Sequence, residues 1–282
     1  MSTSYANSRP DFVGPDWLRC THGYSFVAAA PPQLRDDGYL ASNNLWERLL
    51  CVTAQAQAGD FRNVEALIEV AMGGDSVHLR DCAVRIFAQA APSALLPRLS
   101  EVLENHADPD IRLEICDVAL LTADPRIGQA LARHRARVAG FESECAMDAV
   151  SAILEPDIDA RELVDSPLDD EAYVEKVDAF ADALVKEHGE GTAMHHGAPL
   201  DLDAVARSIS ELCAEEDPSG GYIFDRLSLI EGMTGAAIAG CLDDDCAPQF
   251  AKISYVLNRL RQDKTLEGFE AGKRYFFGHA LP

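Results

Sequence analysis

Apolar residues recur at every third or fourth position from about residue 42 to residue 154, which is the spacing of helices that each bury one face. Ser42 or Asn43 precedes the first run and suits a helix cap, and Gly or Asp-Pro pairs separate the later runs. Seven helices are therefore predicted: 42–58, one from Asp60 to Gly73, Val77–Ala90, one from Pro92 through Leu103, Asp110–Thr122, one from Pro125 to about Ala139, and Phe141–Leu154.

The predicted helices are short, and so are the turns between them, which makes neighbouring helices antiparallel. The residues also repeat, because Val77–Val84 aligns with Ile111–Val118 at an offset of 34 positions. A series of such helix pairs buries its apolar faces only by stacking, so the pattern predicts an all-α fold with an α-solenoid of helix pairs.

The remaining chain predicts an irregular N-terminal arm and a second helical part. Residues 1–41 carry several Pro and Gly, and we expect Trp17, Phe12 and Tyr24 to pack on the body. After an acidic linker from residue 155, helices are predicted over 170–188, 202–214, 222–240 and 247–262, with a break near Gly232 and a Gly/His loop at 189–199. The aromatic tail, which includes Tyr275, Phe276 and Phe277, is expected to pack back on the body. The predicted divisions are thus an arm at 1–41, helical repeats at 42–154 and an acidic helical subdomain at 155–282.

Net charge is the unusual feature of the composition. The chain has 47 acidic and 24 basic residues, a formal charge of −23, and residues 155–282 hold −16 of it. Such a surface repels phosphate backbones, which argues against nucleic-acid binding, and attracts a basic protein. Solubility alone would also account for this charge. If the charge serves binding, the expected partner-binding residues lie in the two most acidic stretches, and they are Asp169, Asp170, Glu171, Glu175, Asp178, Asp182, Glu215, Glu216 and Asp217.

The eight cysteines form no CxxC pair, and several fall inside apolar helical patterns. This usage is typical of reduced, buried thiols and predicts a cytoplasmic protein without disulfides. Cys51, Cys82, Cys116 and Cys145 fall about once per helix pair, and we expect them to be buried, unpaired and far from one another. No stretch approaches the ~18 apolar residues of a membrane span, so no membrane partner is expected.

The segment Asp108-Pro109-Asp110-Ile111-Arg112, followed by Ala119-Leu120, resembles the HEAT-repeat pattern of an Asp-Pro turn, a Val/Ile-Arg pair and an Ala/Leu stripe. A weaker copy includes Asp75, Val77, Arg80 and Ala83. The resemblance covers roughly residues 42–154, and it implies a binding scaffold.

Three further groups raise the question of chemistry. Asp243-Asp244-Asp245 suggests a magnesium or diphosphate site, but adjacent carboxylates on a helix diverge, and a helix cap explains them better. The loop with His188, His195 and His196 lacks the i, i+4 spacing of helical metal sites. Arg133, His134, Arg135 and Arg137 form a basic patch, interpreted as a solvated helix C-terminus in preference to an anion contact.

The sequence therefore favours a non-catalytic protein-binding scaffold with no cofactor and no metal. In size, acidity, helical repeats and lack of catalytic motifs the chain resembles the all-α immunity proteins of bacterial toxin systems. That resemblance implies an inhibitor of a basic toxin or nuclease domain. Two alternatives stay open: an all-helical enzyme using the His188–His196 loop or Asp243–Asp245, and a regulatory adaptor.

Overall fold

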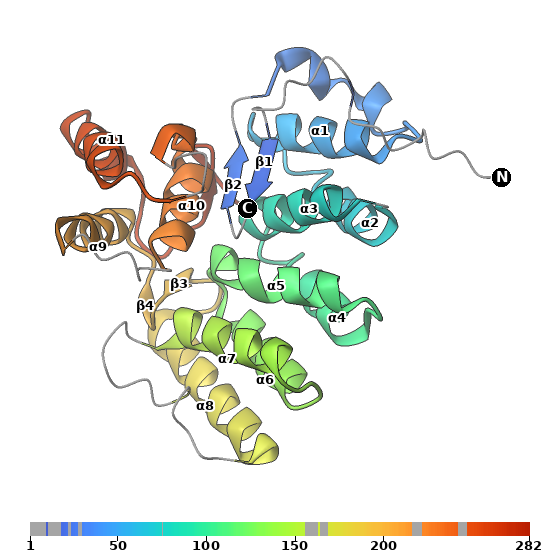
Figure 1. Ribbon diagram of the computed structural model, residues 1–282, viewed down its shortest axis with the longest axis vertical. Helices are drawn as coiled ribbons and strands as arrows, with labels where there is room; N and C mark the ends of the chain where they lie inside the picture. The colour runs from blue at the N-terminus through green and yellow to red at the C-terminus, as the bar shows by residue number, and fades with distance from the viewer. Residues whose placement is uncertain are drawn as a thin grey trace. The chain divides into compact units, whose positions relative to one another are not determined.

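The computed structural model in Figure 1 describes residues 10, 18–21, 24–27, 30–74, 76–155, 163, 169–215, 222–241 and 247–282. The described chain is mostly helical, as predicted. Its α-helices are α1 (Leu45–Ala56), α2 (Ala66–Gly73), α3 (Val77–Ala90), α4 (Pro97–Asn105), α5 (Pro109–Thr122), α6 (Pro125–Arg135), α7 (Phe141–Leu154), α8 (Asp170–His188), α9 (Leu202–Glu215), α10 (Tyr222–Thr234) and α11 (Phe250–Gln262).

Short polar side chains start several of these helices. Asn44, Asp108 and Asp124 each accept a hydrogen bond from the backbone N–H two residues ahead, and Asp169 accepts one from Ala172 N at 2.9 Å. Each bond satisfies a donor that the first turn leaves without a helical partner. The Asp-Pro pairs therefore begin α5 and α6 as predicted, whereas the first helix is capped by Asn44 instead of Ser42 or Asn43.

Several predicted helix boundaries were wrong. Helix α2 begins at Ala66 instead of Asp60, and α6 ends at Arg135 instead of near Ala139. Pro92 does not open a helix, because residues 93–96 form turns and α4 begins at Pro97. A helix running from Pro92 would place Pro97 in its interior, where the ring clashes with a carbonyl. The helix predicted over 222–240 ends at Thr234, where Gly235 takes a φ of +72°. The next helix begins at Phe250 instead of residue 247.

Contacts group the chain into two compact units. Unit 1 comprises Met1–Ala91, Leu202–Glu270 and Tyr275–Leu281, and unit 2 comprises Pro92–Asp201, Ala271–Arg274 and Pro282, as far as the structure describes them. The solenoid arrangement of 42–154 and the boundaries at 41 and 154 stay predictions.

In unit 1, α1 packs on α2 and α3, and α9 packs on α10 and α11. Helix α3 also contacts α10, and Gln89 Nε2 donates to Ser228 O at 3.1 Å. A Cβ on Gly232 would lie 2.8 Å from the Gln89 amide carbon, so this glycine permits the close approach of α3 and α10. The largest buried apolar side chains of this unit are Leu34, Leu49, Leu50, Leu67, Leu79, Ile86, Phe87 and Phe276.

In unit 2, α6 is the central helix and packs on α4, α7 and α8, while α5 packs on α7. Figure 1 shows α7 and α6 in green beside α8 in yellow. The apolar core between these helices contains Ile111, Ile115, Val118, Ala130, Leu131, Val150, Ile153, Leu154, Tyr173 and Val177.

In the part of the chain that the structure describes, three two-stranded antiparallel hairpins accompany the helices, and the all-helical prediction did not include them. They are β1 (Leu18–Thr21) with β2 (Tyr24–Val27), β3 (Met194–His195) with β4 (Ala198–Pro199), and β5 (Tyr275–Phe276) with β6 (His279–Ala280). The first lies in the segment predicted as an irregular arm, where Phe12 and Trp17 fall outside the described residues. Within the described ranges there are also four short 3-10 helices: η1 (Pro32–Arg35), η2 (Asp37–Tyr39), η3 (Ala239–Cys241) and η4 (Thr265–Gly268).

The turns of the second and third hairpins both donate hydrogen bonds to carbonyl groups at the end of a helix. The turn residues His196 and Gly197 have φ values of +49° and +69°, and their N–H groups donate to Ala152 O and Ile153 O at the end of α7. Phe277 and Gly278, at +49° and +81°, donate to Gly232 O and Met233 O near the end of α10. Each hairpin turn therefore supplies donors to helix carbonyls that lack partners within the helix. The burial of Phe276 also confirms that the aromatic tail packs on the body.

Each of these two hairpins follows a set of three helices. We call three helices and the hairpin that follows them a module. Helices α6, α7 and α8 are followed by β3–β4, and α9, α10 and α11 are followed by β5–β6. In each module the first helix packs on the second and the third, and the hairpin contacts the second. The first module lies in unit 2 and the second almost wholly in unit 1. This repeated order of elements was not predicted, because the sequence pattern indicated only a repeat of 34 residues.

Candidate partner-binding surface

Helix α8 carries most of the acidic residues that the sequence singled out. Asp169 caps it, and Asp170 and Glu171 in the first turn interact favourably with the positive end of the helix dipole. Its apolar positions face the rest of unit 2, where α6 lies against it. These buried residues are Tyr173, Val177, Ala181 and Leu184.

The acidic positions of α8 form one stripe. Glu171, Glu175, Asp178 and Asp182 follow each other at intervals of four, three and four residues, so they lie within about 60° of one another around the helix. Glu171, Glu175 and Asp182 are exposed, and Asp178 is half-buried. We call these four residues the acidic stripe. It gives unit 2 a line of negative charge along the solvent side of one helix.

The basic residues of α6 are neutralised within unit 2. Arg133 Nη1 lies 3.6 Å from Asp178 Oδ1, and Arg133 Nε donates to Glu104 Oε1 at 3.3 Å. Arg135 donates to Asp170 Oδ1 at 2.9 Å, and its guanidinium lies 4.1 Å from the centre of the Tyr173 ring. The interpretation of this patch as a solvated helix end was therefore wrong for His134 and Arg135, with 3% and 16% of their side chains exposed, whereas Arg133 stays 40% exposed at the helix end. These ion pairs include one residue of the acidic stripe, Asp178. Glu171 and Glu175 stay exposed to solvent.

A cavity of about 220 Å³ lies between the start of α6, the second half of α8 and the loop after α8. Asp124 and Arg126 form a two-pronged ion pair there, with Arg126 Nη2 2.5 Å from Asp124 Oδ2 and Arg126 Nε 2.9 Å from Asp124 Oδ1. This pair raises the pKa of Arg126. The lining residues are Asp124, Pro125, Arg126, Gln129, Ala181, Asp182, Val185, Glu190, Gly191 and Thr192.

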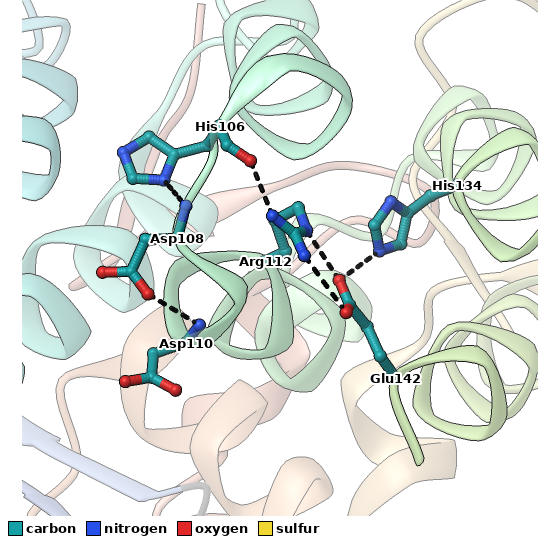
Figure 2. Close-up of polar contacts among 6 residues, drawn as sticks. All are labelled: His106, Asp108, Asp110, Arg112, His134 and Glu142. Atoms are coloured by element: carbon teal, nitrogen blue, oxygen red, sulfur yellow. Dashed lines mark hydrogen bonds and ion pairs between the residues drawn. The ribbon is translucent and has the colours of Figure 1, made fainter. Parts of the chain in front are cut away.

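A second polar cluster joins α5, α6 and α7 (Figure 2). Arg112 donates through Nε and Nη2 to the two carboxylate oxygens of Glu142, at 2.6 and 3.2 Å, and through Nη1 to His106 O at 2.7 Å. His134, which is buried, lies with Nε2 2.9 Å from Glu142 Oε1. The loop before α5 is fixed by Asp108, whose N–H donates to His106 Nδ1 and whose carboxylate caps Asp110 N. The cluster therefore holds α5, α6, α7 and the Asp108-Pro109 turn together.

The electrostatics of this cluster follow from its geometry. The hydrogen bonds and charge of Arg112 lower the pKa of Glu142, so the carboxylate stays ionised. Burial lowers the pKa of His134 despite the nearby carboxylate, so the imidazole is neutral at pH 7 and donates through Nε2–H. The hydrogen-bonding groups of Arg112, Glu142 and His134 face one another, which suits a structural clamp.

The lowered pKa of His134 predicts a pH-dependent stability. Its folded value lies below the ordinary 6.5, so the unfolded chain takes up this proton first as pH falls. We expect the free energy of unfolding of unit 2 to be highest above pH 6.5 and to decrease below it. Glu142 adds a further loss only below its ordinary value of 4.5. His134→Gln, which keeps a donor for Glu142, should flatten the profile between pH 7 and 5 in denaturant titrations.

His188→Gln is the matched control for that profile, because His188 lies at the end of α8 and is only half-buried. An unchanged slope in His134→Gln would show that the buried imidazole does not cause the pH dependence.

The histidines of the predicted Gly/His loop lie in and before the second hairpin. The rings of His195 and His196 contact edge to face at 4.3 Å, and His188 Nε2 lies 3.8 Å from Glu187 Oε1. In the part of the chain that the structure describes, no group of three or more His, Cys, Asp or Glu residues is arranged to hold a metal ion. Asp243, Asp244 and Asp245 lie outside the described residues.

The predicted partner-binding residues are only partly brought together. Those of α8 share one helix, with Asp169 and Asp170 at its start and the acidic stripe along its side. Glu215 ends α9 in unit 1, with only its backbone described, and Glu216 and Asp217 lie outside the described residues. Glu142 was not predicted as a member of a polar site, because its partners Arg112 and His134 lie on two other helices.

The cysteines with described side chains are free thiols. Cys51, Cys82 and Cys116 are buried as expected, whereas Cys145 is half-exposed, which corrects the prediction for that residue. Burial raises the pKa of Cys116, and Cys145 adds to this effect. Burial raises the pKa of Cys145 to about 11, and such a thiol is a poor nucleophile at neutral pH.

Among the described residues, no helix combines the length and the apolar character that a membrane crossing requires. Comparisons with known protein families, curated proteins and solved structures find no match to this chain.

Proposed function

We propose that this chain is a non-catalytic scaffold that binds a basic protein through the acidic surface of α8 in unit 2. The acidic stripe is the observation that carries the proposal. Glu171, Glu175 and Asp182 are exposed on one side of α8, and the helix with its flanking residues 169–190 contains eight acidic against two lysine residues. A line of carboxylates on a rigid helix offers several contacts at once to Arg and Lys side chains.

The partner that fits this surface is a small basic protein, and a toxin or nuclease domain is the class we favour. Such domains carry positive patches that bind phosphate backbones, so an acidic protein competes for the same surface. Binding of this kind would make the chain an inhibitor or immunity protein. A regulatory adaptor would use the same contacts without blocking its partner.

The proposal predicts a salt-dependent association rate. The partner is first purified from the native cell on the immobilised chain, and association is then followed by stopped-flow or biolayer interferometry. We expect the rate constant to fall about tenfold or more between low and physiological ionic strength. Glu171→Lys with Glu175→Lys should lower the low-salt rate by about tenfold. Asp169 and Asp170 are left intact, because changing them would also affect folding. Asp169 caps α8, and Asp170 pairs with Arg135.

Asp117→Lys with Glu144→Lys is the matched control, because both residues are exposed on α5 and α7 and the pair changes the net charge equally. We expect a reduction of less than threefold in this control. Equal reductions in both double variants, or a rate that ignores salt, would contradict binding through α8. The activity of the captured partner, assayed with and without the chain, separates an inhibitor from an adaptor.

A further inference from the structure

The cavity of unit 2 has the size of a single side chain. Its volume of about 220 Å³ exceeds the roughly 30 Å³ of one water molecule several times but falls below the roughly 300–1,000 Å³ of small-molecule pockets. It opens at the C-terminal half of α8, where the acidic stripe ends at Asp182. A protein bound along the stripe would therefore pass over its mouth.

The lining of this cavity is apolar on one side and acidic at the edge. Pro125, Ala181 and Val185 provide the apolar surface, while Asp182 and Glu190 are exposed. Asp182 Oδ1 accepts a hydrogen bond from Gln129 Nε2 at 3.3 Å, which fixes its direction.

The other charges of the cavity are balanced within the chain. Asp124 is paired with Arg126 and also interacts with the buried Arg274, so it offers no excess negative charge. Glu190 lies close enough to Arg126 to raise the pKa of that residue. Attraction for an added cation therefore comes from Asp182 and Glu190 together.

The second module also has a cavity near the start of its first helix and the end of its third, and an arginine lines it as well. This cavity, of about 350 Å³, is lined by Asp203 in the first turn of α9, Arg261 in the last turn of α11, and Lys264, Leu266 and Glu267 in the loop that follows. Arg261 Nε lies 3.4 Å from Asp203 Oδ1, which joins the third helix to the start of the first. In unit 2 the lining arginine is Arg126 on α6, which pairs with Asp124, and α8 contributes Ala181, Asp182 and Val185 to the lining.

We propose that the cavity of unit 2 receives one arginine side chain of the basic protein partner. The guanidinium would lie between Asp182 and Glu190 and donate to their carboxylates, and its aliphatic part would cover Val185, Ala181 and Pro125. Arginine suits this lining better than lysine because its planar group donates to two carboxylates at once and is more weakly hydrated. The inference rests on the proposed function, and it assigns one contact of that interface.

The test uses N-acetyl-arginine amide as the probe and methyl NMR of the full chain as the readout. Titration to tens of millimolar should shift the methyl signals of Val185, Ala181 and Thr192 with a dissociation constant on the order of 10 mM, as expected for so small a ligand. Asp182→Asn with Glu190→Gln should weaken binding at least fivefold. N-acetyl-lysine amide should bind at least threefold more weakly than the arginine probe.

Glu171→Gln with Glu175→Gln is the control, because it removes the same amount of charge at two positions of α8 that do not line the cavity. We expect less than a twofold change in this variant. Equal weakening in both double variants, or shifts that spread along α8 without Val185, would overturn the arginine site. The proposed function is tested separately by the association rate of the whole partner. A salt-dependent rate that is lowered by Glu171→Lys with Glu175→Lys but unaffected by Asp182→Asn with Glu190→Gln would refute the cavity proposal alone.

Discussion

Replacing Arg112 by alanine is expected to destabilise unit 2 by about 3 kcal/mol. Arg112 and Glu142 are largely buried, with 17% and 15% of their side chains exposed, and Glu142 also accepts from His134. Removing the guanidinium leaves a buried carboxylate without its charge partner, and the cost of that desolvated charge is not recovered elsewhere. It also removes the hydrogen bond to His106 O that holds the loop before α5.

The measurement is hydrogen exchange of the α5 and α7 amides, combined with denaturant unfolding followed by circular dichroism. Arg98→Ala provides the comparison, since Arg98 pairs with Glu101 on the exposed side of α4 at 2.6 Å. Exposed pairs contribute about 0–1 kcal/mol, so this control should change stability little. A loss below about 1 kcal/mol in Arg112→Ala would mean that the cluster does not act as a clamp.

Gly197→Ala is expected to destabilise unit 2 by roughly 3 kcal/mol or more. Gly197 has a φ of +69°, which disfavours a side chain, and an added Cβ would lie 2.5 Å from the backbone oxygen of Leu154. The hairpin turn would have to move away from α7 and would lose its hydrogen bonds to Ala152 O and Ile153 O. Faster hydrogen exchange at the end of α7 should accompany the loss of stability.

Gly191→Ala separates the two causes. Gly191 also has a positive φ, +80°, but an added Cβ would meet no atom within 4 Å. Only the backbone preference is then lost, which costs about 1–2 kcal/mol. If the two variants are destabilised equally, the contact between the hairpin and α7 contributes nothing measurable.

The hairpins illustrate where sequence patterns are too short to be informative. Strands β3 and β4 have two residues each, and so do β5 and β6, which leaves no room for an alternation of apolar and polar positions. The dipeptides His196-Gly197 and Phe277-Gly278 were the available turn signals, and both take left-handed conformations. Their role depends on the ends of α7 and α10, which lie dozens of residues earlier in the chain.

The ion pairs of Arg135 on α6 and Arg112 on α5 also could not be predicted from the sequence. Arg135 lies 35 residues before Asp170, and Arg112 lies 30 residues before Glu142. Spacing along a sequence predicts ion pairs only within one helix, where three or four residues bring side chains together. The sequence therefore predicted a net charge for this region, and the packing of α6 on α8 decided which charges remain exposed.

The sequence by itself determined the helical elements with local signals. Val77–Ala90, Phe141–Leu154 and the helix over 170–188 were predicted with the ends that the structure has, because caps and helical periodicity act over a few residues. It also determined that α8 is acidic on its solvent side. Tertiary structure alone decided that Asp182 and Glu190 share a cavity and that Arg261 on α11 pairs with Asp203 on α9. The physical reason is that a helix fixes the direction of its own side chains, whereas the packing of separate helices decides which of those side chains meet.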